Sequence, residues 1–333
     1  MKRATVFITH SPHALNHYYG PRALAALQAV AEVRTHDSEQ ELTVSELIER
    51  ASGCDFIVSD RVHAGSAALL MQLPNLLAFC RCAVDIRNVD VATASAQGIL
   101  VTQASAGFKT SVTEWILGAM VDLSRGISDA TRAYHEGQVP IARMGRELRG
   151  STLGIIGFGQ IARTLAPIAR ALGMHLLIND PFVEIDPSDG EATELSHLLG
   201  ESDYVVCLAV ATPDTENLMN AATFAEMKPT AYFVNASRGN LVDEVALLAA
   251  LNTGKIAACA LDVGRAPDQM PSPELARHPL VIATPHIGGL TPQAIEHQSM
   301  ETVQQITALL QGRMPAGAVN PDQALRLKKW LAS

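Results

Sequence analysis

The chain carries the segment LGIIGFGQIA at residues 153–162. An apolar run typical of a β-strand leads into Gly157, Gly159 and Ala162, and an apolar pattern of helical period follows. Gly157 permits a tight turn, Gly159 lets the backbone approach a pyrophosphate, and Ala162 lies where the helix meets the strand. The helix N-terminus favours an anion through its free N–H groups and its dipole. The segment therefore predicts a strand, turn and helix that bind a dinucleotide, with Gln160 and Ile161 in the first helical turn.

A second predicted strand, 174–180, ends in an acid. Asp180 lies 18 positions after Ala162, close to the roughly 20-residue offset of a carboxylate that binds the adenosine ribose. A carboxylate accepts hydrogen bonds from a ribose 2′-hydroxyl but repels a 2′-phosphate. The adjacent residues, Asn179, Pro181 and Phe182, add no cation. The pattern therefore favours NAD over NADP.

Composition narrows the class of protein. The chain has 333 residues, 48% of them hydrophobic, which predicts about two domains with sizeable cores. Its formal net charge of −9 argues against a broad surface for nucleic acid or an anionic membrane. No apolar run is long enough to span a membrane, and the basic start at residues 1–10 is interpreted as a first strand rather than a signal peptide. We therefore expect a small-molecule partner, with neither nucleic acid nor membrane involved.

The five cysteines predict free thiols. Their number is odd, and most of them lie in apolar, strand-like contexts. Cys80 and Cys82 are one residue apart, but no second pair completes a zinc set, so we expect no metal site. Buried thiols are typical of a reducing compartment, which favours a cytoplasmic location.

Strand-like and helical runs alternate along the whole chain, which predicts an α/β architecture. In the first third we expect strands at 6–9, 33–35, 56–58, 77–79 and 100–101, and helices at 22–30, 44–51 and 110–125. Later strands are expected at 174–180, 204–209, 231–235, 257–263 and 281–283, with helices at 194–199, 244–251 and 292–310.

The dinucleotide motif lies in the middle of the chain, with sequence on both sides of it. We therefore predict a doubly wound parallel sheet of the Rossmann type over 106–289, the NAD-binding domain. The second domain is expected to be discontinuous, a flavodoxin-like α/β substrate domain built from 1–105 with 290–333.

Two further motifs follow predicted strands, at the sheet edge where open α/β folds bind ligands. Arg238 lies in NASRG at 235–239, and His286 lies in TPHIGG at 284–289. An arginine fork matches a carboxylate, and a histidine exchanges protons near neutral pH. With a nicotinamide, the pair describes hydride transfer between a 2-hydroxy acid and a 2-oxo acid. A solvated arginine and an ordinary loop histidine remain the alternatives from composition alone.

At these motifs the chain resembles the D-isomer-specific 2-hydroxyacid dehydrogenase family. The family includes D-lactate, D-glycerate and phosphoglycerate dehydrogenases, glyoxylate/hydroxypyruvate reductases and formate dehydrogenase. The resemblance covers nearly the whole chain and runs through the segments 153–162, 212–215, 234–244, 260–263 and 284–289, with weaker matches at 88–90 and 111–114.

The resemblance implies a role for individual residues. Arg238 would bind the substrate carboxylate, His286 would act as general acid and base, and Asp262 would hold the nicotinamide carboxamide. A loop of the first domain that contains Val84 and Asp85 would meet the substrate carboxylate through main-chain amides. Further cofactor contacts map to the matched segments, at Thr113, Thr212, Ala236 and Ser237.

The chain departs from the family pattern near the expected pocket. The family's third catalytic residue is a Glu that falls here on Pro267, and the nearest carboxylate is Asp268. We expect Asp268 to hydrogen-bond the imidazole and fix its tautomer. Asp85 and Arg87 stand where the family commonly has Gly and Asp, and Phe108 stands at a frequent Asn position, so the identity of the substrate does not transfer.

Three functions therefore stay open. The leading hypothesis is an NAD-dependent oxidoreductase that acts on a small D-2-hydroxy acid or 2-oxo acid. The alternatives are a formate- or phosphite-type dehydrogenase, in which Gln269 would pair with the histidine, and an NAD(H)-sensing regulator. From the family we also expect a homodimer.

Overall fold

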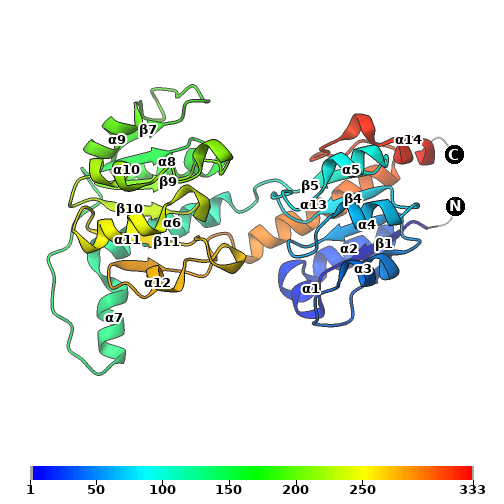
Figure 1. Cartoon of the computed structure of the whole chain (residues 1–333), viewed down its shortest axis with the longest axis horizontal. Coiled ribbons are helices and arrows are strands. Elements are labelled where there is room, and N and C mark those ends of the chain that lie inside the picture. Colours follow the sequence, from blue (N-terminus) through cyan, green and yellow to red (C-terminus); the bar gives the residue numbers. More distant parts are fainter. Residues whose placement is uncertain (1–2, 332–333) are drawn as a thin grey trace. The chain divides into compact units, whose positions relative to one another are not determined.

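The computed structural model describes residues 3–331 and divides the chain into two compact units. Residues 108–291 form one, which we call the central unit, and residues 3–107 with 292–331 form the other, the flanking unit (Figure 1). The central unit thus runs from 108 to 291 where the sequence predicted 106 to 289. Residues 1–2 and 332–333 of the predicted outer domain lie outside the described residues.

The flanking unit is built on a five-stranded parallel sheet in the order β2-β1-β3-β4-β5. This is the flavodoxin-like strand order. Its strands are β1 (Thr5–Ile8), β2 (Glu32–Thr35), β3 (Phe56–Ser59), β4 (Ala78–Arg81) and β5 (Leu100–Gln103). Its helices are α1 (Pro12–Tyr18), α2 (Pro21–Val30), α3 (Val44–Ala51), α4 (Ala67–Gln72), α5 (Val91–Ala96), α13 (Pro292–Leu310) and α14 (Leu325–Leu331), with the 3₁₀ turn η4 (Pro321–Gln323).

Side chains that alternate along the strands give this sheet a core on each face. Val6 and Ile8 pack on one face, where α13 contributes Ile306, and Phe7 packs on the other with Ile57. Both faces are buried because helices cover both, as parallel sheets require.

The central unit is built on a seven-stranded parallel sheet in the order β12-β11-β10-β9-β6-β7-β8. The strands are β6 (Thr152–Ile156), β7 (His175–Asn179), β8 (Glu191–Ala192), β9 (Tyr204–Cys207), β10 (Tyr232–Asn235), β11 (Ala258–Leu261) and β12 (Val281–Ala283). The helices are α6 (Lys109–Arg125), α7 (Ile127–His135), α8 (Gln160–Ala171), α9 (Leu195–Glu201), α10 (Ala221–Glu226), α11 (Glu244–Asn252) and α12 (Pro273–Ala276), with 3₁₀ turns η1 (Pro213–Thr215), η2 (Gly239–Leu241) and η3 (Pro267–Gln269).

The strand order reverses at β6, which pairs with β7 on one side and with β9 on the other. In open α/β sheets, ligands bind outside the carboxyl ends of the strands at such a reversal. The glycine motif follows β6 directly, so the fold puts it at this point. The predicted α/β class with a doubly wound cofactor domain is confirmed.

Three helices of the central unit, α7, α10 and α12, are not among the helices predicted from the sequence. Gly126 adopts a left-handed conformation (φ 63°) that ends α6, and α7 starts immediately after it. None of the residues of α7 is buried, and Figure 1 shows α7 and the segment after it extending away from the rest of this unit.

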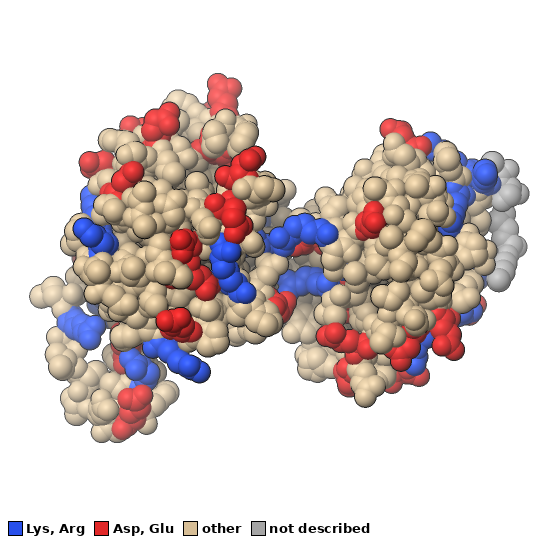
Figure 2. All heavy atoms as spheres, in the orientation of Figure 1, with Lys and Arg blue, Asp and Glu red and all other residues tan. Residues whose placement is uncertain are grey.

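Lys and Arg side chains are interspersed with Asp and Glu on the visible face of both units (Figure 2). Between residues 3 and 331, no helix has the length and apolar character needed to cross a membrane.

Candidate functional site

The turn after β6 needs its first glycine. Gly157 has a φ of +89°, and a Cβ there would lie 2.6 Å from the backbone of Ala209. A Cβ on Gly159 would meet nothing within 4 Å, so the space above this residue is open. Gly159 is the N-cap of α8, and among the described residues no side chain caps this helix end. The first N–H groups of α8 have no partner within the helix, so the turn fits a phosphate.

Asp180 follows β7, and its carboxylate contacts the turn that follows β6. One carboxylate oxygen accepts a 2.7 Å hydrogen bond from the N–H of Phe158, and the other accepts one of 2.9 Å from the N–H of Phe182. A carboxylate has about four acceptor positions, so these bonds leave room for ribose hydroxyls. A dinucleotide therefore fits both halves of this site.

Arg238 follows β10 in extended backbone (φ −147°, ψ 150°) and is half-buried. The side chain of Asn235 donates to the carbonyl of Arg238 (3.0 Å), and the guanidinium Nη1 donates to the carbonyl of Ser237 (2.7 Å). The hydroxyl of Ser237 donates to the carbonyl of Ala209 (2.6 Å), which ties this loop to the end of β9. The arginine is thus presented on a loop fixed to two neighbouring strands.

Asp262 follows β11 and organises the loop that carries the histidine. Its buried carboxylate accepts hydrogen bonds from the hydroxyl of Thr284 (2.6 Å) and from the N–H groups of Ile287 (2.8 Å) and Gly288 (2.7 Å). A Cβ on Gly288 would lie 2.8 Å from this carboxylate, so a side chain there would displace it. The carboxylate is therefore a scaffold for residues 284–288.

His286 is half-buried on this loop in a left-handed conformation (φ 57°), which is uncommon for a residue other than glycine. Its Nδ1 lies 3.0 Å from the main-chain carbonyl oxygen of Asp268. A carbonyl only accepts, so Nδ1 carries the proton and Nε2 is the basic nitrogen of the neutral ring. The contact between Asp268 and the imidazole thus runs through the main chain, whereas the sequence pointed to the carboxylate. The carboxylate's own role stays a prediction.

Two glycines join the arginine loop to the segment that faces His286. A Cβ on Gly239 would lie 2.1 Å from the carbonyl carbon and oxygen of Gly264. A Cβ on Gly264 would in turn lie 2.5 Å from Pro271. The main chain after β10 therefore touches the main chain after β11, with no room for a side chain between them.

The other predicted residues are divided between the two units. Gln160 and Ile161 begin α8, Thr212 caps η1, and Ala236 is buried beside Ser237. The hydroxyl of Thr113 is buried and donates to the carbonyl of Lys109 (2.9 Å). Within the flanking unit, Val84 and Asp85 follow β4, and the carboxylate of Asp85 accepts from the main chain and guanidinium of Arg87.

Sequence reasoning missed Arg265, which lies between Asp262 and Asp268. Its guanidinium makes four hydrogen bonds, to Asn240 within η2, to Val242 directly after η2, and to Glu216 and Asn217 directly after η1. The available signal was an arginine next to a glycine directly after a strand end. The glycine pair Gly239 and Gly264 was also missed, because only the fold brings the two residues together.

Taken together, the carboxyl edge of the central sheet presents an uncapped helix N-terminus, the carboxylate of Asp180, the guanidinium of Arg238 and the oriented imidazole of His286. These groups suit a dinucleotide and a small anionic substrate that exchanges a proton during reaction.

Comparison with known proteins agrees with this chemistry. Residues 117–288 match the family model described as "D-isomer specific 2-hydroxyacid dehydrogenase, NAD binding domain". The D-3-phosphoglycerate dehydrogenase of Synechocystis sp. is 33% identical over 314 residues, which are 92% of this chain and 56% of that protein. The chain thus spans about half the length of the curated relatives it matches.

Solved structures extend the similarity to both units. The TT0316 protein of Thermus thermophilus is 27% identical, with a TM-score of 0.85 over 95% of this chain and 99% of that one. The D-lactate dehydrogenase of Escherichia coli shares the fold, with a TM-score of 0.81 at 24% identity over 95% and 99% of the two chains. The family match confirms the resemblance seen in the motifs and NAD as the predicted cofactor. The chain belongs to the D-isomer-specific 2-hydroxyacid dehydrogenase family.

Proposed function

We propose that the protein is an NAD-dependent oxidoreductase that transfers a hydride between NAD(H) and a small D-2-hydroxy acid or 2-oxo acid. The observation that carries the proposal is the imidazole of His286, whose Nδ1 is held by a main-chain carbonyl (3.0 Å). This contact leaves Nε2 as the nitrogen that exchanges a proton. NAD, when bound, supplies the carbon that gives or accepts the hydride.

Each residue then has one task. Arg238 binds the substrate carboxylate through its planar fork and polarises the neighbouring carbonyl. His286 donates a proton from Nε2 to the carbonyl oxygen during reduction and takes it back during oxidation. Asp262 keeps the histidine loop in place, and one acceptor position remains on its carboxylate for the nicotinamide carboxamide.

The turn after β6 and the carboxylate that follows β7 hold the other half of the cofactor. The main chain at Gly157, Gly159, Gln160 and Ile161 would meet the pyrophosphate. Asp180 would accept from the ribose hydroxyls, which favours NAD over NADP.

The decisive experiment follows NADH oxidation with glyoxylate, hydroxypyruvate, pyruvate and phenylpyruvate. Reduction of at least one 2-oxo acid, lost in both His286→Ala and Arg238→Ala, supports the proposal. Turnover of NAD with formate or phosphite and no 2-oxo acid would replace it with the second hypothesis. NADH binding without any turnover would point to a regulator.

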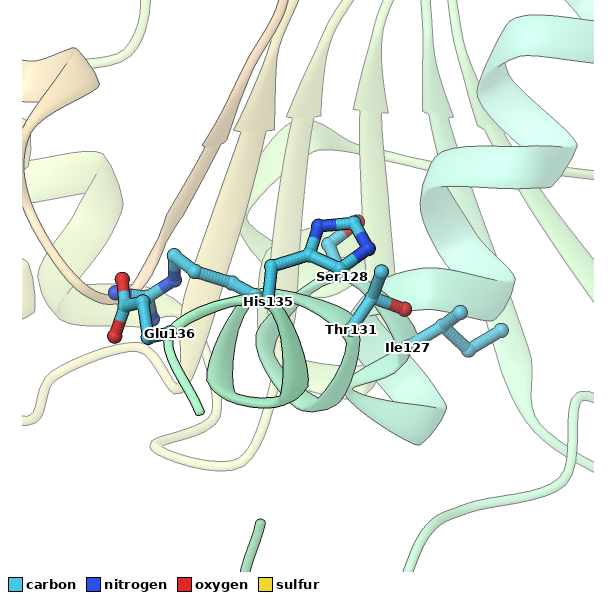
Figure 3. Close-up of a pocket in the computed structure, with 6 residues that line it drawn as sticks. Ile127, Ser128, Thr131, His135 and Glu136 are labelled. Carbon is cyan, nitrogen blue, oxygen red and sulfur yellow. The ribbon is translucent and has the colours of Figure 1, made fainter. Parts of the chain in front are cut away.

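We also propose that the protein forms a homodimer through α7 and the segment 137–147. Val139, Ile141 and Met144 in this segment are 87%, 87% and 101% exposed. On α7, Ser128, Thr131 and His135 lie on one side and line a shallow depression of about 440 Å³ (Figure 3). Apolar side chains this exposed and this close in sequence are typical of a covered surface, and a second copy can cover both patches at once.

Sedimentation tests the dimer. Ile141→Asp with Met144→Asp should yield monomers, whereas Val245→Glu, on an equally exposed apolar residue of α11, should not. A monomeric parent protein would contradict the proposal.

The five cysteines are free and buried, which supports the cytoplasmic location expected from the sequence.

A further inference from the structure

The orientation of His286 depends on a single main-chain oxygen. The carbonyl of Asp268 accepts the Nδ1 proton at 3.0 Å, and it belongs to a short turn between Gly264 and Met270. A carbonyl can be supplied by any residue, so the contact depends on where the turn is held rather than on which side chain it carries. Whatever fixes this turn therefore fixes the imidazole.

The turn has an unfavourable backbone. Asp268 and Gln269 are consecutive residues with left-handed φ angles of 54° and 58°, a conformation that residues with a Cβ rarely adopt. Two main-chain hydrogen bonds close the turn, from Gly264 N–H to the carbonyl of Gln269 (2.8 Å) and from Ala266 N–H to the carbonyl of Met270 (3.0 Å). Strained backbone of this kind persists where surrounding contacts hold it.

Arg265 supplies those contacts. Its Nε donates to the carbonyl of Val242 (3.0 Å), and its Nη2 donates to the carbonyl of Asn240 (3.0 Å) and to the side chain of Asn217 (2.5 Å). Its Nη1 donates to a carboxylate oxygen of Glu216 (2.8 Å). The residue is thus fixed to the segment that follows η1 and to η2 with the residue after it, and Arg238 directly precedes η2.

The main chain of Arg265 is held as well. Its N–H donates to the carboxylate of Glu244 (3.0 Å), in the first turn of α11. The hydrogen bonds from Arg265 and Asn240 lower the pKa of Glu216, which favours its charged form. Because Glu216 offsets the charge of the guanidinium, the arginine acts mainly through position.

We propose that Arg265 is a positioning residue for His286, because it holds the turn whose Asp268 carbonyl accepts the Nδ1 proton. The inference rests on the proposed acid–base role of His286. In this arrangement a main-chain oxygen orients the imidazole ring. A side chain that does not touch the reacting groups fixes the position of that oxygen.

The test reads the imidazole directly. Protein labelled with ¹⁵N-histidine is compared by two-dimensional NMR in the parent and in Arg265→Ala, with His286→Ala to assign the signal. The parent should show the neutral ring protonated at Nδ1, and Arg265→Ala should show a mixture with the Nε2-protonated form. Turnover should fall about 10- to 100-fold, since misplacement of a reacting group by about 1 Å costs that much. The KM for the 2-oxo acid and the affinity for NADH should change less.

Three variants make the result specific. Glu216→Gln keeps an acceptor and removes the charge, so the Nδ1-protonated form should remain. Arg265→Lys keeps the charge but not the fork, so it should restore the tautomer only in part. Arg50→Ala, which removes a comparable exposed ion pair with Asp37 in the flanking unit, should leave the signal of His286 and the turnover unchanged.

Each outcome decides between the two proposals. An unchanged tautomer and turnover in a folded Arg265→Ala protein would overturn the positioning role while the proposed function stands. An Nε2-protonated ring in the parent would overturn the carbonyl contact itself. A parent that reduces no 2-oxo acid, yet loses the Nδ1-protonated form in Arg265→Ala, would overturn the proposed function and leave the positioning role intact.

Discussion

The two units place charged residues at the same edge of similar sheets, but these residues differ in burial and in hydrogen bonding. In the flanking unit, His10 follows β1, Asp60 follows β3 and Arg81 ends β4. His10 and Arg81 are 2% and 1% exposed, and Asp60 lies 2.8 Å from Nδ1 of His63. The polar groups there are enclosed, and Arg81 donates to the hydroxyl of Ser59 and the carbonyl of His63.

In the central unit the corresponding edge carries Asp180, Arg238 and His286, all half-buried. Their hydrogen bonds run mostly to the main chain of the loops that present them. Similar residue types at the same position in a fold thus form an ionic core in one unit and an accessible site in the other.

The largest expected difference between the edges is catalytic. His286→Ala should lower the rate of 2-oxo acid reduction about 10²- to 10⁴-fold, the usual contribution of a general acid. NADH binding, measured by fluorescence titration, should change little because the phosphate and ribose contacts lie elsewhere. His197→Ala, at an exposed position of α9, is the matched control. A His286→Ala protein with near-parental turnover would refute the catalytic assignment.

The ionic core of the flanking unit should instead appear in the pH dependence of stability. Burial lowers the pKa of His10 from 6.5 to about 4, so below pH 6.5 the unfolded chain takes up a proton that the folded chain does not. The free energy of unfolding should therefore fall by about 3 kcal/mol between pH 6.5 and pH 4. Burial works to raise the pKa of Asp60, but the hydrogen bond from His63 and the charges of both histidines hold it lower, so stability falls further in more acid solution.

Urea titrations at several pH values measure this effect. Trp330 packs near Phe56 in the flanking unit, and Trp115 is the other tryptophan of the chain, so Trp115→Phe leaves a probe of the flanking unit alone. His10→Gln removes the titration and should flatten the curve between pH 6.5 and 4. An unchanged slope in His10→Gln would show that other groups cause the acid sensitivity.

Close packing gives a third contrast. A Cβ on Gly239 would press on the backbone of Gly264 at 2.1 Å, whereas a Cβ on Gly65 in the flanking unit would meet only side chains, Val89 at 2.9 Å and Phe79 at 3.2 Å. Gly239→Ala should cost about 1–3 kcal/mol of stability, the range for overpacked sites, and should also lower turnover. Gly65→Ala should cost less because side chains can shift. Thermal unfolding and steady-state kinetics compare the two, and equal costs would remove the argument for a rigid contact between the loops.

The smallest expected effect concerns cofactor choice. Asp180→Ser removes a negative charge that would face a 2′-phosphate, which is worth about 1 kcal/mol or roughly fivefold at 4 Å in water. The preference for NADH over NADPH, measured as a ratio of kcat/KM values, should narrow by about that factor. A parent protein that turns over NADPH faster than NADH would contradict the assignment of Asp180.

Long periodic elements were predictable because their apolar pattern is read directly from the sequence. The bounds expected for α3, α13 and β12 are those observed. The sequence analysis missed β8, which has only two residues, and α7, none of whose residues is buried. An apolar pattern in the sequence indicates a buried face, so an element that buries no face is hard to predict from it.

The site was predictable in its residue types but not in its contacts. The motifs located Arg238 and His286 because the chemistry needs those side chains. They could not locate the carbonyl that faces His286, since every residue carries one, nor the role of Arg265, whose partners at 216–217 and 240–242 are distant in sequence. Such contacts form only when folding brings loops that are distant in sequence next to one another.

The position of α13 has a consequence for synthesis on the ribosome. Val303, Ile306 and Leu309 of this helix belong to the same core as Leu27 of α2, yet residues 108–291 are made between them. At about 5–20 residues per second, translation of that stretch delays α13 by roughly 10–40 s. During this interval the first five strands emerge without one wall of their core, while the inserted unit has its whole sequence available. The nascent chain therefore completes the inserted unit first, and its earliest segment waits longest for protection from aggregation and from chaperone capture.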